Sequence, residues 1–360
     1  MQGQTHRWTG VLGGLALLLP YPALALCTTV TTSPAAFGTI SSIAVRTTSQ
    51  PSSSLNAGLS CTGSLLSVLA SNDHFYATIT STQSGLLGPT GDVIGYTLYG
   101  NNSTSYPITR GTPFDFGRNS IIDLLGLLGS PTVAKQVPIY LGSITGSNVA
   151  AGVYTENLSI FWNWNYCSGI AVLGGCLGRD IGSGTKSLTV TMTVSNDCVI
   201  TAPNISFGSA PVISAFATVT GQTINLMCTK GSAYTVGLSD GQQPLSAGGR
   251  RRMISGSNYL AYDIFKSAGS TRWGSVGAAR RASTDAEVFP GNGLGTGSQI
   301  FNYNAKTVLP PRIVSSTGML ASAPAAASGP KSSARGDRPS TTRSASLPGV
   351  IEPISWSENS

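Results

Sequence analysis

One ordered set of landmarks occurs twice along this chain of 360 residues, and it limits the fold more than any other feature. Each copy opens with a cysteine, passes a Phe-Gly pair, and reaches a second cysteine that is followed directly by threonine. The matching positions are Cys27 and Cys198, Phe37-Gly38 and Phe207-Gly208, Cys61-Thr62 and Cys228-Thr229, Ile94–Tyr99 and Leu260–Phe265, and Gln136–Tyr140 and Gln299–Tyr303. Landmarks repeated in one order at similar spacing indicate a tandem duplication of one domain type.

Apolar and polar residues alternate within each copy, which is the pattern of half-buried strands. Only 10% of the residues are charged, and 44 glycines and 20 prolines separate the short apolar runs. This composition excludes helical bundles and coiled coils, and it favours an all-β sandwich or barrel in each copy. The clearest strands are Tyr154–Tyr166, with Leu158, Ile160, Trp162, Trp164 and Tyr166 on one face, and Leu188–Val194.

Residues 1–25 have the form of a secretory signal peptide. Arg7 lies in a short polar start, Val11–Leu19 is apolar, and Ala23-Leu24-Ala25 is an A-x-A cleavage site. A lipoprotein signal is the alternative because Cys27 follows closely, but the large Leu26 before that cysteine argues against lipidation. We therefore expect export through the periplasm to the cell surface, or secretion.

Six cysteines follow the signal peptide, and an even number in an exported chain predicts disulfides. Fifteen pairings are formally open. Pairing neighbours along the chain gives Cys27–Cys61, Cys167–Cys176 and Cys198–Cys228. A zinc site is a poor alternative because there is no CxxC pair and His74 is the one histidine outside the signal. We predict no metal and no cofactor.

The formal charge of +7 is spread along the chain and does not predict nucleic-acid binding. The densest groups, Arg250–Arg252 and Arg280-Arg281, are not interleaved with aromatic residues and are typical of solvated loops. His74 has no nucleophile motif around it, and the acidic residues are not grouped with other polar candidates. We therefore predict no catalytic residues and no enzymatic activity.

Together with a late strand, Gly152-Val153-Tyr154-Thr155-Glu156, the landmarks resemble the spore coat protein U domain family. The full set falls in residues 27–166 and most of it in 198–306. Members of that family include subunits of archaic, Csu-type chaperone–usher pili, and its two-domain members are tip adhesins. The resemblance implies an immunoglobulin-like pilin fold that lacks its final strand. It also implies an outer-membrane usher and a periplasmic pilus chaperone that fills the gap before an adjacent pilin subunit donates a strand.

We divide the chain into a signal peptide (1–25), an N-terminal adhesin domain (26–195), a C-terminal pilin domain (196–310) and a disordered or aberrant tail (311–360). The alternating run Lys186–Val194 is expected to complete the first domain from its own chain, while the second domain needs a donated strand. Cleavage after Ala25 would leave no donor segment ahead of Cys27, which predicts a place at the distal end of a pilus.

Three apolar stretches of the first domain fall where loops are expected. A disulfide between Cys167 and Cys176 would hold its segment as a stiff protruding hairpin, and the glycines there favour exposure. Ile121–Leu128 fits a buried strand or short helix as well as an exposed loop, so both interpretations stay open. The candidate surface-binding residues are Leu86, Leu87, Ile121, Ile122, Leu124, Leu125, Leu127, Leu128, Ile170, Val172, Leu173 and Leu177.

If these stretches converge at one end, they form an apolar patch of the kind that marks a binding surface. The predicted function is adhesion to hydrophobic surfaces, abiotic or host, as a step toward biofilm. One alternative is a secreted spore-coat-like structural protein. Another is a carbohydrate-binding tip lectin that would use Trp162, Trp164 and Tyr166, although their strict alternation favours a place in the core.

The C-terminal tail departs from the family pattern. No second Gly-x-Tyr-Thr strand follows Lys306, and Ala321–Ser346 is rich in Ala, Ser, Pro, Gly and Arg. Such a stretch has too little apolar material to fold. A frameshift near residues 307–318 and a genuine disordered extension are both open explanations, and either predicts that the last strand of the second domain is missing.

Overall fold

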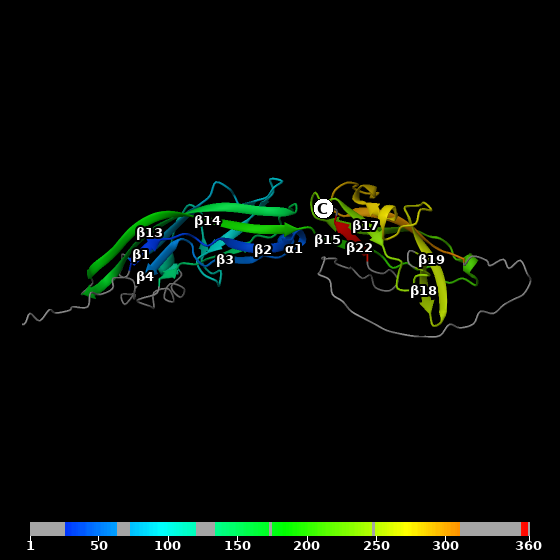
Figure 1. The fold of residues 1–360 in the computed structure, drawn as a ribbon, viewed down its shortest axis with the longest axis horizontal. Coiled ribbons are helices and arrows are strands. Elements are labelled where there is room, and N and C mark those ends of the chain that lie inside the picture. Colours follow the sequence, from blue (N-terminus) through cyan, green and yellow to red (C-terminus); the bar gives the residue numbers. More distant parts are fainter. Residues whose placement is uncertain are drawn as a thin grey trace, which may run out of the picture.

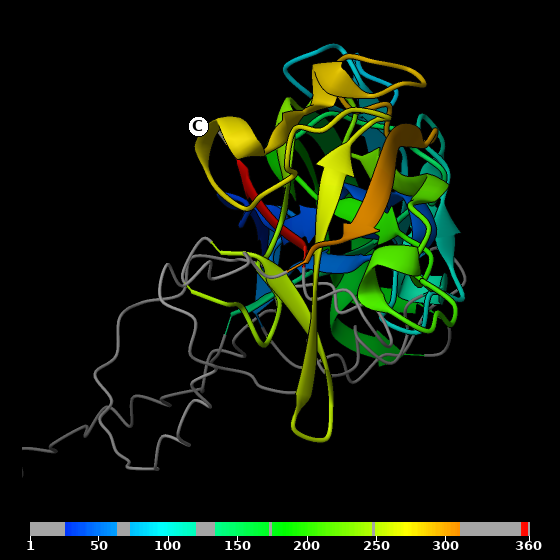
Figure 2. The same ribbon diagram turned by 90° about the vertical axis from the view of Figure 1, so that its right-hand side faces the viewer.

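The computed structural model describes residues 26–62, 73–119, 134–172, 175–246, 249–309 and 354–358. Two β-rich bodies lie end to end in an elongated molecule (Figure 1), and seen along its long axis the second body lies in front of the first (Figure 2). Helices in the described part are short: α1 (Ser42–Thr47), α2 (Phe116–Asn119), and the 3-10 turns η1 (Ile213–Ala215), η2 (Gly277–Ala279) and η3 (Ser283–Asp285). The predicted all-β class with two tandem sandwich domains is confirmed.

The first domain is built around a sheet in the order β10-β5-β13-β14-β2, with β6 and β7 attached to β13. Two smaller sheets, β1-β4-β11 and β3-β12-β8-β9, complete the domain, and one apolar core is shared by all three. The bounds are β1 Leu26–Thr29, β2 Ala35–Ser41, β3 Pro51–Ser54, β4 Leu59–Thr62, β5 His74–Thr80, β6 Leu86–Leu87, β7 Val93–Ile94, β8 Tyr96–Tyr99, β9 Pro107–Ile108, β10 Pro113–Asp115, β11 Lys135–Gln136, β12 Ile139–Ser143, β13 Gly152–Val172 and β14 Gly175–Ser195.

Strand β14 completes this sheet from within the same chain. It runs antiparallel to β13 along its whole length and parallel to β2, where Val190 lies opposite Ala35. The expectation that Lys186–Val194 closes the first domain is therefore confirmed. The two strands also run farther than predicted, because most of the expected loop between Tyr166 and Lys186 continues the ladder.

The alternating aromatic residues of β13 lie in the core. Trp162 and Tyr166 are fully buried, Trp164 is nearly so, and the Trp162 indole Nε1–H donates to the Ala57 carbonyl at 2.9 Å. The core interpretation of these residues is confirmed. A buried ring has no face free for a sugar to stack on, so the lectin alternative loses the residues on which it rested.

The second domain consists of a sheet in the order β15-β16-β21-β19-β18 and a smaller sheet in the order β20-β17-β22. Its separate core surrounds Trp273, which is fully buried and donates its indole N–H to the Val236 carbonyl at 2.9 Å. The bounds are β15 Cys198–Thr201, β16 Val219–Cys228, β17 Tyr234–Leu238, β18 Arg251–Ser255, β19 Asn258–Lys266, β20 Arg281–Ala282, β21 Gln299–Thr307 and β22 Ile354–Glu358.

Strand β22 comes from the tail and pairs antiparallel with β17, with Trp356 opposite Val236. The expectation of a tail that contributes no strand is therefore wrong for these five residues. Their alternating sequence, Ile-Ser-Trp-Ser-Glu, suits a strand. The composition that indicated too little apolar material to fold was that of Ala321–Ser346, which ends before these residues.

The three disulfides are those predicted from neighbouring cysteines: Cys27–Cys61, Cys167–Cys176 and Cys198–Cys228. In each domain one disulfide joins the first strand to a facing partner. Cys27 of β1 lies opposite Cys61 of β4, and Cys198 of β15 lies opposite Cys228 of β16. Such cross-links contribute a few kcal/mol, about 2–4, to a glycine-rich domain with short strands.

The two domains touch through a small polar junction beside α1. The Ser42 and Thr229 hydroxyls are 2.6 Å apart, and Lys230 Nζ lies 2.5 Å from an Asp92 carboxylate oxygen. Burial alone would raise the pKa of the Asp92 carboxyl, but hydrogen bonds from Lys230, from the Ala150 N–H and from Thr90 hold it below its usual value. The junction therefore contains a charged carboxylate at neutral pH.

Candidate functional site

The hairpin formed by β13 and β14 ends in a disulfide-closed tip at the end of the first domain farthest from the second (Figure 1). Cys167 lies opposite Arg179, the register then shifts, and the ladder resumes with Ile170 opposite Leu177. The Cys167–Cys176 disulfide crosses the hairpin within this irregular part. A cross-linked ladder this short has few conformations to lose, which favours contact with a partner surface.

Ion pairs and hydrogen bonds fix the base of the tip to the body of the domain. Arg179 donates to the Asp73 carboxylate and to the Asn165 amide oxygen, both at 2.7 Å. The Asp180 carboxylate accepts the Cys27 backbone N–H at 2.7 Å. Because Asp73 is buried, the Arg179 contact is stronger than an ordinary surface pair. The tip is therefore held in one direction.

Two glycines of β14 explain why a glycine-rich stretch forms a strand here. A Cβ on Gly182 would lie 2.2 Å from the Trp164 ring, and one on Gly184 would lie 2.7 Å from the Thr29 methyl carbon. Glycine in a strand often marks such a close approach. Gly182 and Gly184 lie between the two predicted strands, and they make room for the core tryptophan and for β1.

The predicted residues of the tip lie on this hairpin. Ile170 and Val172 belong to β13 and Leu177 to β14, with backbone pairing throughout. Leu173 lies outside the described residues, and the whole of Ile121–Leu128 does too. That these side chains bind a surface stays a prediction.

The third predicted stretch does not join the tip. Leu86 is fully buried, so its assignment to a binding surface is wrong, while Leu87 beside it is 40% exposed. Residues 86 and 87 form β6, and Leu87 pairs with Thr155, near the start of β13. At about 3.3 Å per residue, Thr155 and Ile170 are separated by roughly 50 Å of strand. The expected convergence at one end is therefore also wrong for this stretch.

Three exposed apolar side chains between the tip and the middle of the sheet were not predicted from the sequence. Phe161 is 45% and Ile181 66% exposed, and Tyr76 lies opposite Asn163 on the adjacent strand β5. We call Tyr76, Phe161 and Ile181 the outer hairpin face. The signal was present in the sequence, because Phe161 and Tyr76 are apolar residues at positions where the alternation calls for polar ones.

The Gly-x-Tyr-Thr-acid motif has a structural role at the other end of β13. The Tyr154 hydroxyl donates to the Ala150 carbonyl at 2.7 Å, and buried Glu156 accepts two hydrogen bonds from Arg110 at 2.5 and 3.0 Å. Burial by itself would raise the pKa of Glu156, but the hydrogen bonds from Arg110 hold it lower than usual. The carboxylate is held in a structural ion pair.

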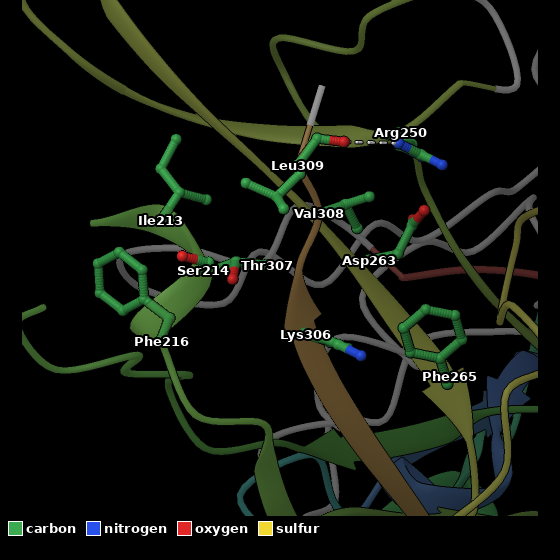
Figure 3. A pocket seen from close by; sticks show the side chains of 10 residues that line it. All are labelled: Ile213, Ser214, Phe216, Arg250, Asp263, Phe265, Lys306, Thr307, Val308 and Leu309. Atoms are coloured by element: carbon green, nitrogen blue, oxygen red, sulfur yellow. Dashed lines mark hydrogen bonds between the residues drawn. The ribbon is translucent and has the colours of Figure 1, made fainter. Parts of the chain in front are cut away.

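A groove of about 560 Å³ opens at the end of the second domain that faces away from the first (Figures 1 and 3). It lies between η1, β19 and the end of β21, and Arg250 donates across it to the Leu309 carbonyl. In the first repeat α1 is the helix that follows Phe37-Gly38, and in the second repeat η1 follows Phe207-Gly208, so the two helices occupy corresponding positions. Helix α1 lies at the junction between the domains. The lining residues are Ile213, Ser214, Phe216, Arg250, Asp263, Phe265, Lys306, Thr307, Val308 and Leu309.

The described residues include no group of three or more His, Cys, Asp or Glu side chains able to hold a metal ion. Over the same part of the chain, no helix has the length and apolar character needed to cross a bilayer. The predicted signal peptide, residues 1–25, lies outside the described part.

Among solved structures, the chain is similar to the CsuC–CsuE chaperone–tip adhesion subunit pre-assembly complex from archaic chaperone–usher Csu pili of Acinetobacter baumannii. The identity is 24% and the TM-score 0.51, over 78% of this chain and 94% of that one. A second match, the CupB6 tip adhesin of Pseudomonas aeruginosa, is 12% identical with a TM-score of 0.29, over 79% and 88% of the two chains. The first likeness supports the fold, and the second is too low to carry an argument. No curated protein matches the chain.

The family model for the Spore Coat Protein U domain matches twice, over residues 17–160 and 184–316. The two matches correspond to the two copies of the landmark set, and together they cover well over half of the chain. They include both β1–β4 and β15–β16 disulfide pairs and most of the residues that form the two cores. The chain belongs to the Spore Coat Protein U domain family.

Proposed function

We propose that this protein is the tip subunit of a chaperone–usher pilus and that it attaches cells to hydrophobic surfaces as a step toward biofilm formation. The observation that carries the proposal is the β13–β14 hairpin. It closes the first domain from within and presents a cross-linked tip at the end of the molecule away from the second domain.

The self-completed sheet supports a terminal position. Pilus subunits of this kind join when one chain adds a strand to an open sheet of the next. In the first domain that place is occupied by β14, which contacts both β13 and β2. A domain without a vacant strand position does not receive another subunit and is free to face outward.

The division into an adhesin domain, residues 26–195, and a pilin domain, residues 196–310, is part of this proposal. It is supported by the two separate cores and by the groove at the outer end of the second domain. That end corresponds in the repeat to the α1 end of the first domain, which already contacts a following domain. The next pilin subunit would be placed there.

The partners follow from the same proposal. The similar chain from Acinetobacter baumannii was solved in a chaperone–tip adhesion subunit complex. For this protein we propose a periplasmic chaperone, an outer-membrane usher and a neighbouring pilin that donates a strand. Export to the cell surface is the location that these partners require.

The proposed contact surface is the tip together with the outer hairpin face. The hairpin exposes Phe161 and Ile181. Its sequence is apolar again at the tip, at Ile170, Val172, Leu173 and Leu177. Each aliphatic side chain removed from water against an apolar solid contributes at most about 1.5–3 kcal/mol. A single tip would then bind weakly, and many pili on one cell would multiply weak contacts into firm attachment.

The test compares apolar residues of the tip with an exposed apolar side chain near the opposite end of β13. Val172→Ser with Leu173→Ser alters the tip, while Val153→Ser removes an apolar side chain that is 59% exposed near the opposite end of β13. On cells carrying the assembled pilus, retention on polystyrene should fall at least tenfold for the tip variant and stay unchanged for Val153→Ser.

Circular dichroism and disulfide mapping check that both variants fold. Equal retention of the tip variant and the wild type would remove the tip from the contact surface. If pili fail to form around a correctly folded subunit, or if the subunit is found in a coat layer, the structural-protein alternative gains.

A further inference from the structure

The small sheet of the second domain repeats one half of the large sheet of the first. Its order is β20-β17-β22, and the corresponding order in the first domain is β10-β5-β13. Both outer strands run antiparallel to the central one in each case. A five-residue strand from the C-terminal tail thus stands where the first domain has the 21-residue strand β13.

The register of β17 against β5 can be fixed independently of β22. In β5 the buried side chains are those of Phe75, Ala77 and Ile79, and in β17 they are those of Tyr234, Val236 and Leu238. The outer strands β10 and β20 agree with this alignment. The last residue of β10, Asp115, pairs with Tyr76, and the last residue of β20, Ala282, pairs with Thr235. Val236 is therefore the counterpart of Ala77.

With that alignment, β22 and β13 carry the same residue types at the same positions. Trp162 lies opposite Ala77, and Trp356 lies opposite Val236. Ile160 lies opposite Ile79, and Ile354 lies opposite Leu238. An isoleucine and a tryptophan at two matching positions, in a tail otherwise rich in small and polar residues, match the chemistry of the first domain as well as its topology.

We infer that Ile354–Glu358 is the second domain's counterpart of β13 and that it forms the edge on which this domain receives a strand from another chain. The long stretch of sequence between β21 and β22 does not prevent this pairing, because the entropic cost of closing a loop grows only with the logarithm of its length. Strand β17 would otherwise leave a row of backbone groups unpaired beside a buried core.

The receiving edge is the side of β22 that faces away from β17. In the first domain β13 pairs on its far side with β14, which in turn pairs with β2. Among the described residues, β22 pairs with β17 alone. The counterpart of β2, the segment around Phe207-Gly208, lies near the core through Ile205 but belongs to no strand. A strand equivalent to β14 would fill the place between the two.

The first experiment traps the pairing of β22 in the full chain. Thr235 and Ser357 lie directly opposite each other, a separation that suits a disulfide. The variant T235C with S357C should form a cross-link between these two positions, detected by mass spectrometry after proteolysis. The matched control, S239C with S357C, places the cysteines four residues out of register and should not cross-link. A control that links as well as the test pair, or a test pair that stays reduced, overturns the inference.

The second experiment tests the receiving edge, which rests on the proposed role as a strand-accepting subunit. The probe is a fluorescent peptide with the β14 sequence Lys186–Ser195, which the first domain already uses to close its own sheet. It should bind the full chain and lose at least tenfold in affinity when residues 350–360 are deleted. Deletion of residues 321–340 shortens the tail without removing β22 and should leave the affinity unchanged.

A peptide with Leu188→Asp and Val190→Asp provides the sequence control and should also bind at least tenfold more weakly, because both positions are buried in β14. Equal binding to the chain without residues 350–360, or no binding to the full chain, overturns the assignment of the edge. Neither experiment involves an adhesive surface, so a failure here is distinguishable from a failure of the adhesion assay.

Discussion

The two domains begin alike and end differently. Each opens with a disulfide between its first strand and a facing partner, and each centres on a buried tryptophan whose indole N–H donates to a backbone carbonyl. Among the described residues, however, the first core holds 30 buried residues and the second 14. Ten of the thirty lie on β13 and β14, the two strands that have no full counterpart in the second domain. The difference in how the sheet is closed therefore accounts for most of the difference in core size.

This comparison separates what the landmarks encode from what the closing strands add. The cysteines, the Phe-Gly pair and the tryptophan are enough to build a recognisable half of a sandwich. Burial of the closing strands adds hydrophobic free energy to the first domain and so offsets more of the conformational entropy lost on folding. We expect a domain with less of this burial to be less stable on its own.

Separating the two domains is the most direct test of this contrast. We expect residues 26–195 to unfold in urea as one cooperative transition, because β14 completes its sheet. Residues 196–310, which lack β22, should show no cooperative transition and should aggregate. Circular dichroism and tryptophan fluorescence measure both. An N-terminal half that fails to fold, or a second half equally stable alone, would remove the contrast on which the proposed function rests.

A second prediction compares the two central tryptophans. Trp162→Ala and Trp273→Ala each remove a fully buried indole and should each cost about 3–5 kcal/mol of unfolding free energy. With its larger core the first domain should remain folded, whereas the second should lose its structure. The neighbouring Phe161→Ala alters an exposed side chain and should change stability by less than about 0.5 kcal/mol. If Trp273→Ala lowered the unfolding free energy less than Trp162→Ala, the second domain would be more stable than the size of its core indicates.

Much of this architecture could be predicted from the sequence, because its signals are local. Alternation identified the core side of β13, with Trp162 and Trp164 inside, and neighbouring cysteines gave the three disulfides. The strand that closes the first domain was predicted for the same reason, since Lys186–Val194 alternates by itself.

The errors concern residues whose role is set by a distant partner. Gly182 and Gly184 lie in a strand because Trp164 and Thr29 approach their backbone, and no local pattern contains that information. Leu86 is buried because its short strand is attached to β13, almost 70 positions further along the chain at Thr155. Ile354–Glu358 could be assigned only from its pairing with β17, which lies more than 110 positions earlier in the chain.

A third prediction sharpens the account of the glycines. Gly182→Ala places a methyl group 2.2 Å from the Trp164 ring, which is itself packed in the core, and should cost about 1–3 kcal/mol. Gly95→Ala is the matched control, because its nearest neighbour would be the Ile144 side chain at 3.4 Å, an ordinary contact. Urea unfolding of the full chain measures both. If the two variants were equally stable, close packing at Gly182 would not be what holds the long hairpin together.

The smallest expected effect concerns the junction between the domains. Asp92 and Lys230 are joined at 2.5 Å, but the lysine side chain is well exposed, so the pair should couple by less than about 1 kcal/mol. A double-mutant cycle with Asp92→Asn and Lys230→Gln measures that coupling and cancels the loss of the Ala150 and Thr90 hydrogen bonds.

The pH dependence of this coupling has a definite sign. The folded pKa of Asp92 lies below the ordinary value of 3.8, so the contribution is fully present above that value and is lost as the pH falls through the lowered pKa. The coupling should therefore be the same at pH 7 and pH 5 and should disappear near the acid limit of the fold. A coupling that weakened already between pH 7 and pH 5 would show that another titrating group controls the junction. A coupling of zero throughout would mean that this ion pair does not help to hold the two domains together, which would leave that role to contacts such as Ser42–Thr229.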